Sequence, residues 1–266
     1  MLAGNDIDPF ARETFAATHP EAVFLPGPIE KLSAADFLKA SKIKSGELDC
    51  LIGCPPCQAF SICNHQRGMH DRRSHLFREY LRIVKGVAPK WVVMENVPGI
   101  TSVGDGRAVR DIMDGLRELG YSVEMRTLKA EEYGVPQERR RIFFVGNRIG
   151  IPVRFPVPTH GTKERPFVTV GDAIGDLPKL ANGENCDSDV VKNHEAPELA
   201  SVNLKRMKFI PQGGSWRDIP FALLPAGMKK AKRSDHTKRY GRLSPNGLAC
   251  TILTKCDLHW GAFIHP

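Results

Sequence analysis

Short apolar runs alternate with amphipathic stretches along the first 146 residues of the chain. Three short runs are rich in β-branched or aromatic residues and end near a polar residue or a glycine, as buried strands do. They are residues 49–53, 91–95 and 142–146. Two longer stretches carry an apolar residue every three or four positions, the pattern of a helix with one buried face. They are residues 74–87 and 107–119, with Gly120 placed to end the second helix. The alternation predicts an α/β fold.

The pattern changes after Asn147. Residues 151–158 form a proline-rich, extended segment, and from residue 159 onward the periodicity is weak and glycine and proline are frequent. We find no internal repeat and no low-complexity segment. We therefore expect two domains, an α/β domain over residues 1–150 and a smaller loop-rich region over residues 151–266.

Composition narrows the classes of protein that fit. With 266 residues, 41% hydrophobic and 26% charged, the chain is typical of a globular protein. No apolar run approaches the ~18 residues that a membrane span needs, and the first residues do not resemble a signal peptide. The seven cysteines, an odd number without an export signal, indicate a reducing compartment, so we expect a cytoplasmic protein.

The positive charge is concentrated in one segment. Residues 201–242 contain eleven Lys or Arg and two acidic residues, a net charge of +9, whereas the whole chain carries +8. A solvated basic surface would have this composition. Clustered cations also bind phosphates favourably, because binding releases the counterions of the polyanion. The segment therefore predicts a surface that binds a polyanion.

The most informative cysteine is Cys57, in the sequence Leu-Ile-Gly-Cys-Pro-Pro-Cys-Gln-Ala-Phe-Ser that covers residues 51–61. Two prolines stiffen the backbone just before its thiol, at the end of a predicted strand, which suits a nucleophile held at the edge of a sheet. Cys54 and Cys57 also form a C-x-x-C pair, but no clear helix start follows, as a thiol-disulfide site would need. Zinc binding by Cys50, Cys54, Cys57 and Cys63 is disfavoured because the spacing lacks two paired knuckles, so we expect no metal site.

Two further polar segments follow in order, Met-Glu-Asn-Val-Pro-Gly at residues 94–99 and Gln-Glu-Arg-Arg-Arg at residues 137–141. The three segments together, with 38 residues from Cys57 to Glu95 and 44 from Glu95 to Arg139, resemble the cytosine-C5 DNA methyltransferase family. Methylation of C5 needs a thiolate that adds to C6, an acid near N3 that stabilises the adduct and a cation near O2. A cysteine, a glutamate and an arginine are the residue types for these roles.

This resemblance implies a role for several residues. Cys57 corresponds to the family's nucleophile, Glu95 to the acid at N3, and Arg139 and Arg141 to the two arginines that stabilise the adduct. Three neighbours support them: Gln58 follows the nucleophile, Asn96 orients the loop, and Gln137 opens the arginine motif. The polar segment 58–73 corresponds to a loop that closes on DNA and drives the target base out of the stack.

The resemblance also implies S-adenosylmethionine as cofactor and a Rossmann-like class I methyltransferase sheet. Asp6 matches an acid that bonds the ribose hydroxyls and Ile7 an apolar residue that packs on adenine. The other predicted donor contacts are Ile29, Pro56 and Leu76. Before Ile29, Pro28 stands where the family commonly has an acid.

Some motifs of the family have no counterpart here. The Phe-x-Gly-x-Gly-Gly turn that follows the first strand has no match, and neither do the two last motifs, an Arg-Glu-x-x-Arg helix and a Gly-Asn-Ser segment. We therefore expect a fragment, a truncated gene product or one half of a split enzyme, with a complementing subunit supplying the missing motifs.

The basic region is expected to recognise double-stranded DNA. In the family this region reads bases from the major groove. The candidates for DNA contact are Arg217, Lys238 and Arg239 in the basic region and Ser61 in the polar segment 58–73. Two other functions stay open: a catalytically inactive DNA-binding fragment and a transfer-RNA cytosine methyltransferase. A role in bacterial or phage restriction-modification fits the compact size by analogy.

Overall fold

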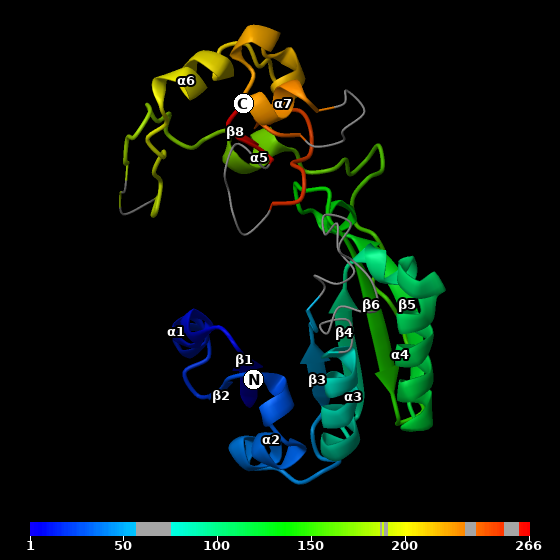
Figure 1. The fold of residues 1–266 in the computed structure, drawn as a ribbon. Helices are drawn as coiled ribbons and strands as arrows, with labels where there is room; N and C mark the ends of the chain where they lie inside the picture. The colour runs from blue at the N-terminus through cyan, green and yellow to red at the C-terminus, as the bar shows by residue number, and fades with distance from the viewer. Residues whose placement is uncertain (57–75, 187, 189–190, 232–237, 253–260) are drawn as a thin grey trace. The chain divides into compact units, whose positions relative to one another are not determined.

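The protein is described by a computed structural model covering residues 1–56, 76–186, 188, 191–231, 238–252 and 261–266 (Figure 1). The chain divides into two compact units. The first contains Met1–Leu128 and Arg140–Pro156, and the second contains Lys129–Arg139 and Val157–Pro266. The segment 129–139 thus packs with the second unit although it lies between two strands of the first. The functional boundary expected between residues 150 and 151 stays a prediction.

The first unit is an α/β structure. In chain order its elements are β1 Ala3–Asp6, α1 Pro9–Thr18, β2 Val23–Pro26, the 3-10 turn η1 Ile29–Lys31, α2 Ala34–Ser41, β3 Cys50–Gly53, α3 Leu76–Val87, β4 Trp91–Asn96, the 3-10 turns η3 Pro98–Thr101 and η4 Val103–Gly106, α4 Arg107–Glu118, β5 Ser122–Lys129 and β6 Arg140–Asn147. The α/β fold predicted from the sequence is confirmed, and so are the three strands and two helices for which bounds were predicted, to within two residues. Residues 74 and 75 of the first predicted helix lie outside the described residues.

The described strands of this unit form two sheets. β1 and β2 form a parallel pair, and the other four strands form a sheet in the order β3-β4-β6-β5. β3 runs parallel to β4, whereas β6 runs antiparallel to β4, with Glu95 opposite Phe143 and Asn96 opposite Ile142. The carboxyl ends of β3 and β4 and the start of β6 therefore lie at one edge of the sheet. Residues that follow β3, end β4 and begin β6 are brought together there.

The core of this unit lies between the four-stranded sheet and helices α3 and α4. Alternate residues of β4 are buried, because successive side chains of a strand point to opposite faces. The fully buried apolar side chains include Val84, Val92, Met94, Ile112, Leu116, Ile142 and Phe144. Gly120 ends α4 in a left-handed conformation with φ of 86°, as the sequence predicted.

Helix α3 packs closely on β3 at Gly53. The hydroxyl of Tyr80 lies 3.1 Å from the carbonyl oxygens of both Leu51 and Val93, so that it links β3 and β4. A Cβ atom on Gly53 would lie 2.4 Å from Cδ2 of the Tyr80 ring. Burial raises the pKa of Tyr80 well above its ordinary value. Only glycine allows this approach, which fixes the end of β3 just before Cys54.

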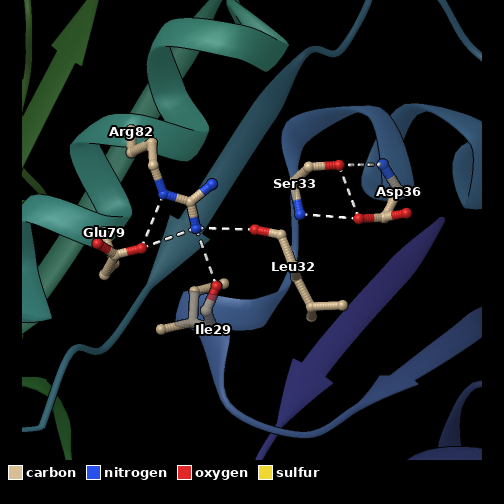
Figure 2. Close-up of polar contacts among 6 residues, drawn as sticks. All are labelled: Ile29, Leu32, Ser33, Asp36, Glu79 and Arg82. Atoms are coloured by element: carbon tan, nitrogen blue, oxygen red, sulfur yellow. Dashed lines mark hydrogen bonds and ion pairs between the residues drawn. The ribbon is translucent and has the colours of Figure 1, made fainter.

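Arg82 connects α3 to the N-terminal part of the unit (Figure 2). Its Nη2 atom donates to the carbonyl oxygens of Ile29 at 2.9 Å and Leu32 at 2.7 Å, while its Nε atom donates to Glu79 at 2.7 Å. Helix α2 follows directly and begins at a capping box made by Ser33 and Asp36. The segment that carries Ile29 is therefore held by hydrogen bonds from α3.

The second unit is rich in loops, as the weak periodicity predicted. Its elements are short: η5 Ala130–Tyr133, α5 Val170–Ile174, α6 Ser201–Met207, η6 Trp216–Asp218, η7 Phe221–Leu223, α7 Ala226–Lys229, and the parallel strands β7 Gly241–Arg242 and β8 Ala262–Ile264. A small core joins them, built from Ile210, Trp216, Ile219, Met228, Tyr240 and Ile264. No helix among the described residues is long and apolar enough to cross a membrane.

Candidate active site

Three of the residues predicted from the sequence, Cys57, Gln58 and Ser61, lie outside the described residues, as does the rest of the predicted DNA-closing loop up to residue 73. Pro56, the last described residue before this loop, is exposed and follows β3, and the described chain resumes at Leu76. The description of the site therefore rests on the residues near the start of this loop, at the ends of β3 and β4 and the beginning of β6.

Glu95 and Arg141 form an ion pair at the edge where β4 ends and β6 begins. The distance from Arg141 Nε to Glu95 Oε1 is 2.6 Å, and the two side chains are only 20% and 23% exposed. Arg141 is further held through a hydrogen bond of 2.8 Å from its Nη1 atom to the carbonyl oxygen of Arg140. The antiparallel pairing of β6 with β4 makes this contact possible between residues 46 positions apart. The guanidinium group therefore orients the carboxylate that the sequence singled out.

Asn96 joins β4 to the segment before the cysteine. Its side chain is 1% exposed, and its Nδ2 atom lies 3.4 Å from the carbonyl oxygen of Pro55. Its Oδ1 atom accepts a hydrogen bond of 2.9 Å from the backbone of Val97. Asn96 thus bonds the chain two residues before Cys57, and this geometry supports the orienting role predicted for it.

Arg139 belongs to the second unit and is fixed through its backbone. Its N–H donates to Glu131 Oε2 at 3.2 Å, and its carbonyl oxygen accepts from the N–H of Ala130 at 2.9 Å. Glu131 is buried, so the η5 turn holds Arg139 at both of its peptide groups. In the same unit, Gln137 forms a bridge with Ala249. Arg139 and Arg141, two positions apart in the sequence, are therefore held by different parts of the chain.

The residues of the first unit that are predicted to bind the methyl donor lie near the ends of strands and at the start of a helix. Asp6 ends β1 with an exposed carboxylate, and its Oδ1 atom accepts a hydrogen bond of 2.9 Å from the backbone of Asp8. Ile7 follows and is 71% exposed, which is unusual for a large apolar side chain. An acid at the carboxyl end of a parallel strand can accept hydrogen bonds from ribose hydroxyls, and an exposed apolar residue beside it can pack on a purine ring.

The other predicted donor contacts are partly exposed. Ile29 begins η1, directly after Pro28, and its carbonyl oxygen accepts from Arg82. Leu76 is the first residue of α3 and is half-buried. The structure keeps these side chains out of the core, so they are available for contact with a small molecule.

The described candidates for DNA contact lie in the second unit. Arg217 and Lys238 are exposed, and Arg239 is half-buried. The guanidinium of Arg217 stacks over the ring of Trp216, with its Cζ atom 5.1 Å from the ring centroid. The carbonyl oxygen of Arg239 accepts from the N–H of Trp216 at 2.9 Å. Among the described residues no group of three or more His, Cys, Asp or Glu side chains is arranged to hold a metal ion.

Sequence reasoning missed the residues that position the site. Tyr80 and Gly53 fix the end of β3, Arg82 holds the segment of Ile29, and Glu131 holds Arg139. The only sequence signal for them was weak, a tyrosine on the apolar face of a predicted helix and a glycine at the end of a strand. Their roles depend on contacts between elements that are far apart in the chain.

Comparison with known proteins shows which proteins this chain is similar to. The model of the C-5 cytosine-specific DNA methylase family matches residues 1–240. The type II methyltransferase M1.HphI of Haemophilus parahaemolyticus is 38% identical over 227 residues, which cover 85% of this chain and 59% of that protein. The type II methyltransferase M.AquIA of Picosynechococcus is 37% identical over 191 residues, which cover 64% of this chain and 77% of that protein. This chain therefore spans little more than half the length of M1.HphI.

A solved structure has a similar fold. The crystal structure of a DNA modification methyltransferase encoded within an E. coli prophage is similar with a TM-score of 0.67, covering 94% of this chain and 75% of that one, at 21% identity. The predicted fold class, a Rossmann-like α/β methyltransferase sheet followed by a loop-rich region, is confirmed.

Proposed function

Because the chain belongs to the C-5 cytosine-specific DNA methylase family, we propose that it transfers a methyl group from S-adenosylmethionine to C5 of a cytosine in double-stranded DNA. The observation that carries the proposal is the convergence at one edge of the sheet. There Glu95 pairs with Arg141, and Asn96 bonds the carbonyl oxygen two residues before Cys57. The relatives named as type II methyltransferases favour a role in restriction-modification, and a bacterial DNA substrate favours a cytoplasmic location.

The proposed chemistry begins with the thiolate of Cys57. It adds to C6 of the cytosine, the C5–C6 double bond opens, and the ring gains a proton at N3 through Glu95, whose carboxylate first takes one up from solvent. S-adenosylmethionine, when bound, supplies the electrophilic methyl group that C5 takes up. A base then removes the proton from C5, the C5–C6 double bond re-forms as the bond between C6 and sulfur breaks, and the thiolate of Cys57 is restored, while N3 returns its proton to Glu95.

The two arginines have complementary parts in this proposal. Arg141 holds the Glu95 carboxyl group in place and adds positive charge beside the ring, where negative charge develops at O2 and N3. Arg139 is the second cation for the adduct, with the η5 turn fixing its backbone. Gln58 follows the nucleophile and is proposed to support it. The target base must leave the duplex to present C6 to a thiol, a step that we assign to the loop containing Ser61.

The donor would be held by residues of the first unit. Asp6 would bond the ribose hydroxyls, Ile7 and Ile29 would flank the adenine, and Pro56 and Leu76 would complete the apolar contacts. The exposed carboxylate of Asp6 and the exposed side chain of Ile7 fit these roles. We propose no metal ion for the reaction.

Both sheets of the first unit have an edge that could pair with a further strand. In a parallel pair of strands, every second residue bonds the neighbouring strand through its backbone groups. The N–H of Trp91 donates to the carbonyl oxygen of Asp49, so the backbone groups of Cys50 and Ile52 point away from β4. On β1 the same reasoning applies to Ala3 and Asn5. We infer that a strand followed by the missing glycine-rich turn pairs here, supplied by a further segment or by a complementing subunit.

The first experiment measures transfer of labelled methyl groups to unmethylated duplex DNA by this chain and by its Cys57→Ala variant. Label that depends on Cys57 is the expected result. A duplex containing 5-fluorocytosine adds a second readout, because fluorine cannot leave C5 as a proton does and the covalent adduct should persist. The same reactions repeated with a polypeptide that carries the Phe-x-Gly-x-Gly-Gly turn test whether that segment is needed.

Two results would redirect the proposal. Binding of DNA without label or adduct, even with the added polypeptide, would identify a catalytically inactive DNA-binding chain. Label that appears on transfer RNA and is not reduced by excess duplex DNA would identify a transfer-RNA methyltransferase instead.

A further inference from the structure

The second unit contains a cavity that the proposed chemistry does not use. Its volume is about 260 Å³. The floor is apolar and consists of the buried side chains of Trp216, Ile219 and Met228. The rim carries the exposed side chains of Arg217, Phe221 and Lys229. Among the described residues that line it there is no acid or thiol, so we consider the cavity as a binding site and not as a second reaction centre.

The rim combines aromatic rings with cations. Arg217 stacks over Trp216 at 5.1 Å, and Nζ of Lys229 lies 5.6 Å from the centroid of the Phe221 ring. Phe221 is 67% exposed, a large exposure for an aromatic side chain with an apolar cavity beside it. Its ring therefore offers a surface on which another flat ring can stack at the mouth of the cavity.

Size and charge define the ligand. Pockets that enclose drug-sized molecules have volumes of roughly 300–1,000 Å³, so this cavity suits a single ring system. The surrounding segment, residues 201–242, carries a net charge of +9, which favours a ligand attached to negative charge. A flat heterocycle flanked by phosphates meets both conditions, and aromatic side chains beside cations are how proteins hold single bases of nucleic acids.

We propose that this cavity holds one unstacked base of the bound DNA, stacked on Phe221, with Arg217 and Lys229 contacting the phosphates on either side. The inference rests on the proposed function in taking DNA as the partner. This base is distinct from the cytosine that reacts, because the residues proposed for catalysis are not among those that line the cavity. A second unstacked base stabilises the opened duplex and adds a position at which DNA sequence is read.

The test compares two duplexes of equal length, one fully paired and one with a single bulged 2-aminopurine, a fluorescent purine. The 266-residue chain is expected to bind the bulged duplex more tightly and to quench its fluorescence. Phe221→Ala removes one stacking contact, so affinity for the bulged duplex should fall about 5- to 100-fold, with little change for the paired duplex. The control is Phe209→Ala, since Phe209 is 45% exposed in the same unit but does not line the cavity.

Salt dependence tests the two cations. Arg217→Ala and Lys229→Ala should each reduce the slope of log affinity against log salt by about one for the bulged duplex. Phe221→Ala should leave that slope unchanged. Circular dichroism of each variant checks that the unit remains folded, which the exposure of the three side chains leads us to expect.

The outcomes separate this inference from the proposed function. Equal affinity of the chain for the two duplexes, or a preference for the bulge that survives Phe221→Ala, overturns the inference while DNA binding stands. Binding to neither duplex contradicts a DNA partner and overturns both. A preference for the bulge that Phe221→Ala abolishes and Phe209→Ala does not supports the inference, whatever the result of the methyl-transfer assay.

Discussion

Replacing Glu95 by glutamine tests the centre of the candidate site. The substitution keeps the shape of the side chain and removes the charge that faces Arg141 across 2.6 Å. At an effective dielectric constant of about 20, two unit charges at this distance attract by roughly 6 kcal/mol, and desolvation offsets most of that. Hydrogen bonds to charged groups contribute about 1.5–3 kcal/mol net, so Glu95→Gln should destabilise the first unit by about 2 kcal/mol.

Amide hydrogen exchange in β4 and β6 is the suitable assay, because it reports on the first unit alone. A loss of about 2 kcal/mol should accelerate exchange by about 10- to 100-fold at the slowest amides. The variant should also lose methyl transfer by about 10²- to 10⁴-fold, the usual cost of removing an acid or base from a reaction.

A double-mutant cycle with Arg141→Gln isolates the pair. If the two substitutions change the free energy of unfolding independently, to within about 0.5 kcal/mol, the ion pair does not exist in solution and the reasoning fails. The ion pair between Lys90 and Asp49 is a matched control, since its distance is 2.7 Å but Asp49 is 85% exposed. Asp49→Asn should have no measurable effect, because exposed pairs contribute little.

Three further predictions follow from the fold of the first unit. Gly53→Ala places a Cβ atom 2.4 Å from a buried ring and should cost about 1–3 kcal/mol in calorimetry, whereas Gly227→Ala, in helix α7 with open space around it, should not destabilise the protein. Arg82→Ala releases the η1 segment and should raise KM for the methyl donor without lowering kcat, and equal kinetics in Arg82→Ala and in the control Arg78→Ala would contradict that role. The pKa of Asp36, lowered by its hydrogen bonds in the capping box, should be measured by NMR below 3.8, and the stability that it adds to α2 should be present above that pH and lost as the pH falls through the lowered value.

The sequence predicted the elements that carry long apolar patterns. Strands β3, β4 and β6 and helices α3 and α4 were found because continuous apolar runs and helical periodicity are strong local signals. Strand β1 was not predicted as a strand, since Ala-Gly-Asn-Asp has no apolar run and belongs to the sheet only through its pairing with β2. Short elements of the second unit were missed for the same reason, because their stability comes from a small shared core.

Resemblance to a family supplied the candidate residues of the site but not their contacts. Arg139 and Arg141 are two positions apart, a spacing that would place both side chains on one face of a strand. In the structure β6 begins at Arg140, so Arg141 belongs to the strand and pairs with Glu95, while Arg139 is held by the η5 turn. Local spacing could not predict this division, because it depends on where a strand begins.

By itself, the sequence determined which residues can do the chemistry and which segments form strands and helices, since both depend on residue type and local pattern. The tertiary structure decided which of these groups meet. The order β3-β4-β6-β5 and the antiparallel course of β6 bring Arg141 to Glu95, and the parallel pairing of β3 with β4 brings Pro55 to Asn96. Strand order and register arise from packing among elements distant in the chain, and no local pattern records them.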